Sequence, residues 1–186
     1  MNLIVFPTKH ENPFPLKVPT GKVVKMNDKI FLCCSGIGTA GTLNLGKTLE
    51  EYPEINTVCE FGTAASVSKG IVGNIYECTT FCDSNGGIIA SSHSLTNLPT
   101  AAVTGDDRIY SGTEYEWADL LEMPLLYTMG TLRFRNITIE FKKHFFSIRL
   151  VSDHGKGNIM EQIIQEISKA KGRIGEILSI FTDITL

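Results

Sequence analysis

Four short groups of small and polar residues recur along the chain, each after an apolar segment. They are Gly36-Ile37-Gly38, Phe61-Gly62-Thr63-Ala64, Thr104-Gly105-Asp106 and Ser152-Asp153. Carboxylates and hydroxyls at such positions can transfer protons, and exposed backbone groups can bind a polar ligand. In an open α/β sheet, ligands bind at the carboxyl ends of the strands, because strand ends and helix N-termini leave backbone groups free. We therefore expect the four groups to mark a ligand-binding edge of one sheet.

The apolar segments between these groups predict the elements that position them. The predicted strands are Leu3–Phe6, Val23–Met26, Ile30–Ser35, Ile55–Phe61, Ile75–Phe81, Ile88–Ser92, Ala101–Thr104, Leu125–Met129 and Phe145–Val151. Helices are predicted over residues 39–52 and 158–182, and residues 131–141 fit either a helix or a strand. The alternation of strands and helices favours a single three-layer α/β domain over residues 1–186, with a central mixed, mainly parallel sheet flanked by helices.

Composition excludes several classes of function. The net charge is −3 and no basic cluster is present, so we expect neither nucleic acid nor an anionic membrane as a partner. No apolar run reaches the roughly 18 residues of a membrane-spanning helix. The N-terminal apolar segment lacks the charged region of a signal peptide, which favours a cytoplasmic protein.

The cysteines and histidines do not predict a metal site. The five cysteines form no C-x-x-C pair, and most lie in strand-like segments, which predicts buried thiols. Cys33 and Cys34 are adjacent and should point to opposite faces of one strand, so they cannot both reach one metal ion. The four histidines are scattered without ligand spacing.

The glycine-rich segment permits a dinucleotide-binding interpretation. Gly36-Ile37-Gly38-Thr39-Ala40-Gly41 matches G-x-G-x-x-G, and Glu60 ends the next predicted strand, where the fingerprint has an acid for a ribose hydroxyl. However, the loop follows a third strand rather than the first of its unit, and the motif accounts for nothing beyond residue 60. An NAD-binding Rossmann protein therefore remains the second alternative.

A second set of motifs covers nearly the whole chain and resembles the nucleoside phosphorylase/nucleosidase superfamily. The closest resemblance is to 5′-methylthioadenosine/S-adenosylhomocysteine nucleosidase and to futalosine hydrolase. This chain is divergent and shorter than is typical for the family, and the missing length falls between Ser84 and Trp117. The segment from Leu3 to Glu11 is similar to the family's N-terminal strand and acidic loop. The other matching segments are Ser35–Ala40 (SGIGK), Phe61–Ala65 (TGSAG), Gly70–Ile75 (LKVGDI), Val103–Asp106 (VSGD) and Ser147–Asp153 (a strand ending in RAISD).

The resemblance implies hydrolysis of the N-glycosidic bond of a purine nucleoside. That reaction needs a proton for the leaving base, a positioned water and stabilisation of an oxocarbenium-like sugar. Asp153 is the candidate acid, Glu11 the candidate for orienting water, and Thr63 a candidate for binding a substrate hydroxyl or water. The alternatives are that Asp153 caps a turn, Glu11 is an exposed loop residue and Thr63 is a helix N-cap.

Other positions depart from the family pattern. Gly130 stands where relatives have a glutamate that holds the ribose hydroxyls, so either another acid replaces it (Glu114, Glu116 or Glu122) or the chain is a non-catalytic nucleoside- or base-binding relative. Arg108 stands near a position where relatives have an aromatic residue; it can stack on a base, bind an anionic substrate group or be a surface residue. The remaining candidate substrate-binding residues are Gly62, Ala64, Asp106, Thr128, Met129 and Ser152.

The segment Glu60-Phe61-Gly62-Thr63 bears on the nucleophile. Phosphorylases of the superfamily carry R-x-G-T there, with an arginine that binds phosphate, and Glu60 occupies that position. A carboxylate repels phosphate, which favours water as the nucleophile. The resemblance further implies a small-molecule purine nucleoside or base as ligand, no cofactor or metal, and a homo-oligomer, with a dimer favoured.

Overall fold

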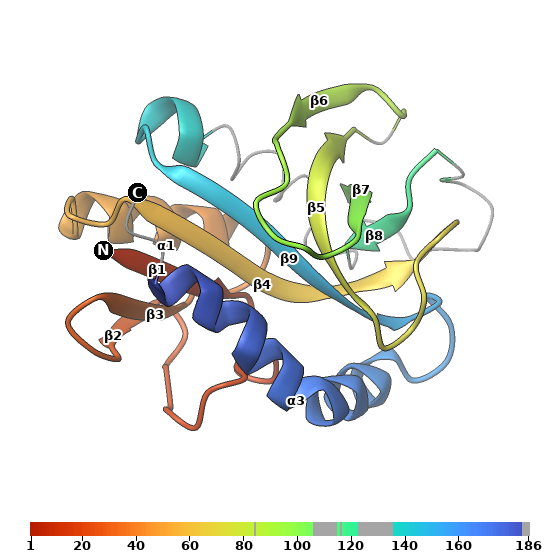
Figure 1. The fold of residues 1–186 in the computed structure, drawn as a ribbon, viewed down its shortest axis with the longest axis horizontal. Helices are drawn as coiled ribbons and strands as arrows, with labels where there is room; N and C mark the ends of the chain where they lie inside the picture. Colours follow the sequence, from red (N-terminus) through yellow and green to blue (C-terminus); the bar gives the residue numbers. More distant parts are fainter. Residues whose placement is uncertain (84, 106–114, 116, 123–135, 184–186) are drawn as a thin grey trace.

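The chain, seen in a computed structural model that describes residues 1–83, 85–105, 115, 117–122 and 136–183, folds around a mixed sheet (Figure 1). Two long helices, α1 (Gly38–Glu51) and α3 (Ile159–Asp183), accompany the sheet. The described strands are β1 (Asn2–Phe6), β2 (Lys22–Lys25), β3 (Ile30–Cys34), β4 (Thr57–Ser66), β5 (Ile75–Cys82), β6 (Ile88–Ser91), β7 (Thr100–Gly105), β8 (Leu120–Glu122) and β9 (His144–Asp153).

Parallel strands occupy the centre of the sheet. β1 pairs in parallel with β3 on one side and β4 on the other, and β9 runs parallel to β4 along its length (Figure 1). β2 and β3 form an antiparallel hairpin at one edge. β9 also pairs with β5, and β5, β7 and β8 lead back to β4, so that these strands close on themselves. The predicted mixed sheet is therefore confirmed.

The side chains of β1 divide the core into two layers. Leu3 and Val5 belong to the apolar cluster that includes residues of α1, whereas Ile4 and Phe6 belong to the cluster that includes residues of α3. Because successive side chains of a strand point to opposite faces, the two helices cover opposite faces of the sheet. The three-layer arrangement predicted from the sequence is confirmed.

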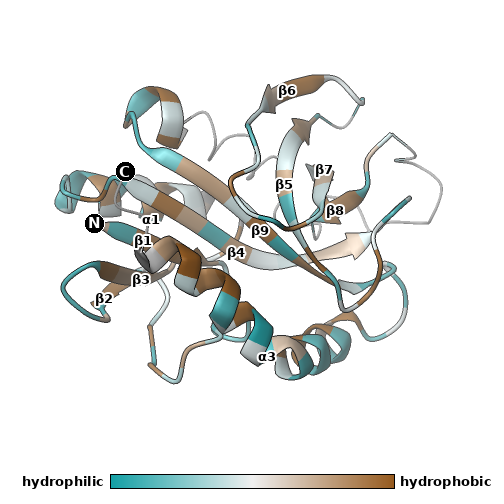
Figure 2. Cartoon of the chain, viewed as in Figure 1, coloured by the Kyte–Doolittle hydropathy of each residue, from teal (hydrophilic) through white to brown (hydrophobic). Residues whose placement is uncertain are grey.

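The helix α3 has the amphipathic pattern expected from the sequence. Its buried positions recur three or four residues apart, the spacing of one helix face. They are Ile163, Ile167, Ala170, Ile174, Leu178 and Phe181. Figure 2 shows hydrophobic and hydrophilic residues alternating along α3, as this one-sided burial requires. Among the described residues, no helix is long and apolar enough to cross a membrane.

Strands β4 and β9 are twice as long as β1, and their extra length positions the site. The pairing of β1 with β4 ends at Val5 and Glu60, but β4 continues to Ser66. The prediction that this strand ends at Phe61 was therefore wrong, because the pairing of β4 with β9 and β8 extends the strand. Residues 61–64 nevertheless lie beyond the carboxyl end of β1.

Other predicted elements have mixed outcomes. The strand β7 extends the predicted strand 101–104 by one residue at each end, so residue 105 belongs to the strand rather than to a loop after it. Of the ambiguous segment 131–141, the described residues Asn136–Glu140 form a π-helix, and the predicted strand at residues 125–129 lies outside the described residues. All five cysteines are buried thiols, as predicted, and Cys33 and Cys34 lie in opposite layers of the core.

Candidate functional site

Glu11 lies in the loop after β1 and is buried, with 3% of its surface exposed, so it is not the exposed loop residue considered as an alternative. Its Oε1 accepts hydrogen bonds from the backbone N–H and the Oγ1 of Thr63, both at 2.9 Å, and its Oε2 accepts one from Thr8 Oγ1, also at 2.9 Å. Burial raises the pKa of the Glu11 carboxyl, while the hydrogen bonds from Thr63 and Thr8 and the charge of Arg149 act in the opposite direction. Glu11 is therefore a buried carboxyl fixed in place and poised to bind a proton.

Glu11 and Arg149 both lie beside Gly62. A Cβ at Gly62 would lie 3.5 Å from Glu11 Oε1 and 3.7 Å from the guanidinium carbon of Arg149. The carboxylate and the guanidinium thus approach the same point on β4, where a Cβ would make ordinary van der Waals contact with both groups. Thr63 follows directly and lies inside β4, so the alternative that Thr63 is a helix N-cap was wrong.

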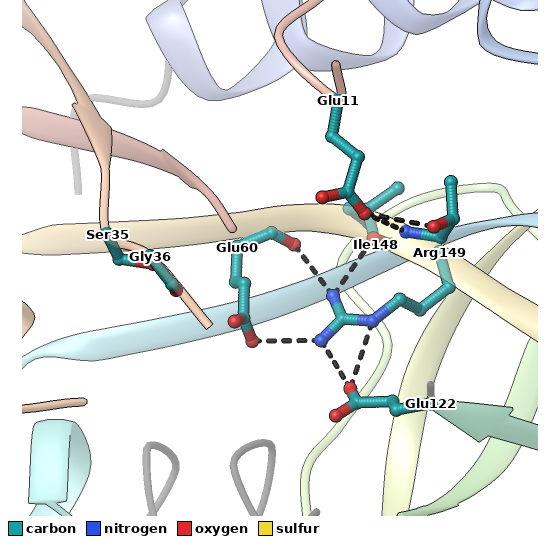
Figure 3. A network of polar contacts seen from close by, with 8 residues as sticks. Glu11, Ser35, Gly36, Glu60, Glu122, Ile148 and Arg149 are labelled. Carbon is teal, nitrogen blue, oxygen red and sulfur yellow. Dashed lines mark hydrogen bonds and ion pairs between the residues drawn. The ribbon is translucent and has the colours of Figure 1, made fainter. Parts of the chain in front are cut away.

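Arg149 is the centre of a buried network (Figure 3). Its Nε donates to Glu122 Oε1 at 3.0 Å, and its Nη2 donates to the same oxygen and to Glu60 Oε2, the latter at 3.0 Å. Its Nη1 donates to two backbone carbonyls, those of Glu60 at 3.3 Å and Ile148 at 3.1 Å. An arginine has five N–H donors, so every donor of Arg149 has an acceptor within the chain.

The buried charges are unequal in number. Among the described residues, Arg149 is the only buried cationic side chain. The buried carboxyl groups are those of Glu11, Glu60, Glu77, Glu122 and Asp153. Glu11, Glu60 and Glu122 surround Arg149, so the network holds more potential negative charge than positive charge, and protons or positively charged groups are favoured there.

Asp153 ends β9, as predicted, and only 2% of its surface is exposed. Its Oδ2 accepts a hydrogen bond from Ser152 Oγ and its Oδ1 accepts one from the backbone N–H of Gly155, each at 2.6 Å. The second bond is the turn-capping contact considered as an alternative role. Asp153 therefore caps a turn, and this contact also fixes its carboxyl at the strand end.

The pairing of β4 with β9 brings the predicted residues together. Thr63 lies opposite Leu150, and Ala65 lies opposite Asp153 after an irregularity in the register. Ser152 Oγ also approaches the Ala64 carbonyl at 3.5 Å. Gly62, Thr63, Ala64, Ser152 and Asp153 thus occupy neighbouring strands, and the loop carrying Glu11 joins them. The other predicted site residues (Asp106, Arg108, Thr128, Met129 and Gly130) lie outside the described residues, as do Glu114 and Glu116.

Two residues of the network differ from the sequence prediction. Arg149 had no predicted site role, and Glu60 had a different one. Arg149 interrupts the apolar strand that leads to Asp153, and a charge within a buried strand requires a buried partner, which was the available signal. Glu60 was expected at a strand end facing a ribose, but it lies inside β4 and is paired with Arg149. The dinucleotide-binding interpretation thereby loses the acid that it required.

Among the described residues, no group of three His, Cys, Asp or Glu side chains is placed to hold a metal ion. The arrangement instead brings together the carboxyl groups of Glu11, after β1, and Asp153, at the end of β9, with the hydroxyl and the backbone N–H of Thr63. These groups can transfer protons and orient water or a polar ligand.

Comparison with known proteins bears on the fold. No family model matches the chain, and no curated protein matches it in sequence. Solved structures do match over nearly the full length. The 5′-methylthioadenosine nucleosidase of Arabidopsis thaliana has a TM-score of 0.73 and 12% identity, with 99% of this chain and 96% of that one covered.

Two bacterial structures give the same result. The 5′-methylthioadenosine/S-adenosylhomocysteine nucleosidase of Helicobacter pylori, bound to butyl-thio-DADMe-Immucillin-A, has a TM-score of 0.67 and 13% identity, over 98% of this chain and 97% of that one. The MTAN of Chlamydia trachomatis, bound to adenine, has a TM-score of 0.66 and 15% identity, over 97% and 98%. The resemblance in the motifs therefore extends to the tertiary structure, and the chain has the nucleoside phosphorylase-like α/β fold of the 5′-methylthioadenosine nucleosidases.

Proposed function

We propose that the protein hydrolyses the N-glycosidic bond of a purine nucleoside of the methylthioadenosine, S-adenosylhomocysteine or futalosine type. The observation that carries this proposal is the contact between Glu11 and Thr63, two residues far apart in the sequence that the motif resemblance assigned to one site. A likeness in fold alone does not require a buried carboxyl at this point. The fold, the motifs and this contact point to the same chemistry.

In the proposed reaction, Glu11 accepts a proton from a water molecule whose oxygen forms a bond to C1′ of the sugar. The bond between C1′ and the base nitrogen breaks, and the base keeps its electron pair. Asp153, when protonated, donates its proton to N7 of the base, because a purine anion is a poor leaving group. The raised pKa of Glu11 suits this role, since a base must have appreciable affinity for the proton it removes.

Glu122 is the acid that we assign to the ribose hydroxyls. Of the three alternatives to the missing family glutamate, Glu122 is the one in the described residues, and it ends β8 with its side chain buried beside Arg149. Its Oε1 receives both bonds from Arg149, which orients the carboxylate. A charged acceptor for two hydroxyls contributes roughly 1.5–3 kcal/mol per hydrogen bond.

The test is base release from methylthioadenosine, S-adenosylhomocysteine, futalosine, inosine and adenosine, each with and without phosphate. We expect release that does not depend on phosphate, and loss of that activity in Asp153→Asn, a nearly isosteric change that retains the acceptor for the Gly155 N–H. Glu77→Gln removes a buried carboxylate elsewhere in the sheet and serves as the control that keeps activity.

Other outcomes have clear meanings. No release from any substrate, combined with thermal stabilisation by a nucleoside or base, would refute hydrolysis and favour a non-catalytic binding protein. Release that requires phosphate would refute water as the nucleophile. Binding of NAD(H) that Glu60→Ala weakens would support the dinucleotide-binding alternative instead.

A further inference from the structure

We propose that Glu60 serves as an internal anion that occupies Arg149 and thereby excludes phosphate from the site. This inference rests on the proposed function only for its consequence, the choice of water as nucleophile. Its physical basis is the network itself, in which Glu60 and Glu122 flank the only buried cationic side chain of the described residues.

The first argument concerns hydrogen-bond donors. A phosphate or sulfate ion bound by an arginine accepts hydrogen bonds from its N–H groups, often two in parallel. Arg149 has no N–H to offer, because Glu60, Glu122 and two backbone carbonyls accept all five. An external anion would have to displace one of the two carboxylates.

The second argument concerns charge. Glu60 and Glu122 together already exceed the single positive charge of Arg149, and Glu11 lies beside the guanidinium across Gly62. An arriving dianion would therefore meet net negative potential in a region from which water is largely excluded, where like charges repel strongly. A neutral water molecule does not face this barrier.

The third argument concerns why the proposal assigns this role to Glu60 and not to Glu122. Glu60 comes from the middle of β4, next to Phe61 and Gly62, whereas Glu122 ends β8. Glu122 accepts two of the bonds from Arg149 through one oxygen, and the Glu60 side chain accepts one. Removing the Glu60 side chain therefore frees one Nη2 donor and the space in front of it, while Glu122 continues to hold the guanidinium.

The experiment measures the binding of inorganic phosphate and of sulfate by calorimetry, without nucleoside, for the unmodified protein, Glu60→Gln and Glu60→Ala. We expect no saturable binding to the unmodified protein. Glu60→Gln removes charge but keeps an acceptor, so its gain should be smaller. Glu60→Ala removes both the charge and the acceptor, so its affinity for the anion should rise at least about tenfold. At the effective dielectric constant of a protein site, the repulsion from one like charge at contact distance corresponds to a larger change in affinity than this.

Glu77→Gln is the matched control. It removes one buried carboxylate whose hydrogen bonds come from Ser94 and Thr96 and not from Arg149, so it should not gain anion binding. Saturable phosphate binding by the unmodified protein would overturn the proposal, as would folded Glu60 variants that bind no better than Glu77→Gln. If Glu60→Ala does not fold, the comparison of Glu60→Gln with Glu77→Gln decides.

A second measurement links the inference to the reaction. With a nucleoside that the unmodified protein cleaves, Glu60→Ala should show phosphate-stimulated base release and form a sugar 1-phosphate, because a phosphate oxygen now bonds to C1′ as the bond to the base breaks. If the unmodified protein cleaves no nucleoside while the anion-binding results are as expected, the proposed function fails and the role of Glu60 stands.

Discussion

Replacement of Glu11 tests whether its carboxylate takes part in the reaction or only stabilises the fold. Glu11→Gln retains an oxygen that can accept from the Thr63 N–H and Oγ1, and it removes the ionisable group. Glu11→Ala removes the acceptor and leaves the buried Thr63 N–H without its partner. An unsatisfied buried donor costs about 1–3 kcal/mol, so we expect Glu11→Ala to lower the free energy of unfolding by about that amount.

The pH dependence of stability gives the sharper test. Burial raises the pKa of Glu11, so the folded protein binds this proton more tightly than the unfolded chain. The stabilisation from proton binding is present below the ordinary pKa of 4.5 and is lost as pH rises through the raised folded pKa. The free energy of unfolding of Glu11→Gln should therefore increase relative to that of the unmodified protein as pH rises, and then level off.

The assay is urea denaturation of the unmodified protein and both variants between about pH 4 and pH 8, together with base release at neutral pH. A proton-transferring group contributes roughly 10²–10⁴-fold to the rate, so Glu11→Gln should lose that factor while matching or exceeding the unmodified protein in stability. A Glu11→Gln variant that becomes less stable than the unmodified protein as pH rises would refute the reasoning, because ionised Glu11 would then stabilise the fold.

Three further predictions concern buried polar groups other than Glu11 and Thr63. Arg149→Met leaves Glu60 and Glu122 buried without their cation and should cost about 3–5 kcal/mol in urea denaturation; a loss below 1 kcal/mol would contradict the network. Glu77→Ala removes the acceptor of backbone and hydroxyl donors in the loop after β6, which should speed hydrogen exchange of the amides it holds, whereas Glu77→Gln should retain part of their protection. Ser147 Oγ has no partner in the described part of the chain beyond a weak interaction with the Cys78 thiol, so Ser147→Ala should change the free energy of unfolding by less than about 0.5 kcal/mol; a larger loss would indicate a missing hydrogen bond.

The local elements could be predicted from the sequence because their signals are local. The apolar run at residues 3–6 and the isoleucine spacing of α3 specify a buried strand and an amphipathic helix wherever they occur. The glycine at position 36 follows β3 with a φ of 84°, a conformation that glycine adopts readily, so the turn into α1 was also evident. Motif order and strand–helix alternation then limited the fold to an α/β class.

The length of β4 and the composition of the network depended on tertiary structure. Gly62-Thr63-Ala64 has the composition of a loop, and only its pairing with β9 and β8 makes it a strand. Glu11 looks like an exposed loop residue until Thr63 is placed against it.

The sequence by itself determined the elements, the α/β class and the set of candidate groups, since these follow from periodicity and residue type. Only the tertiary structure decided which carboxyl groups meet. Glu60, Glu122 and Arg149 come from three strands, and their pairing depends on how β8 and β9 flank β4. Ionic partners are selected by distance in space, and a buried charge has no local signal that identifies its partner.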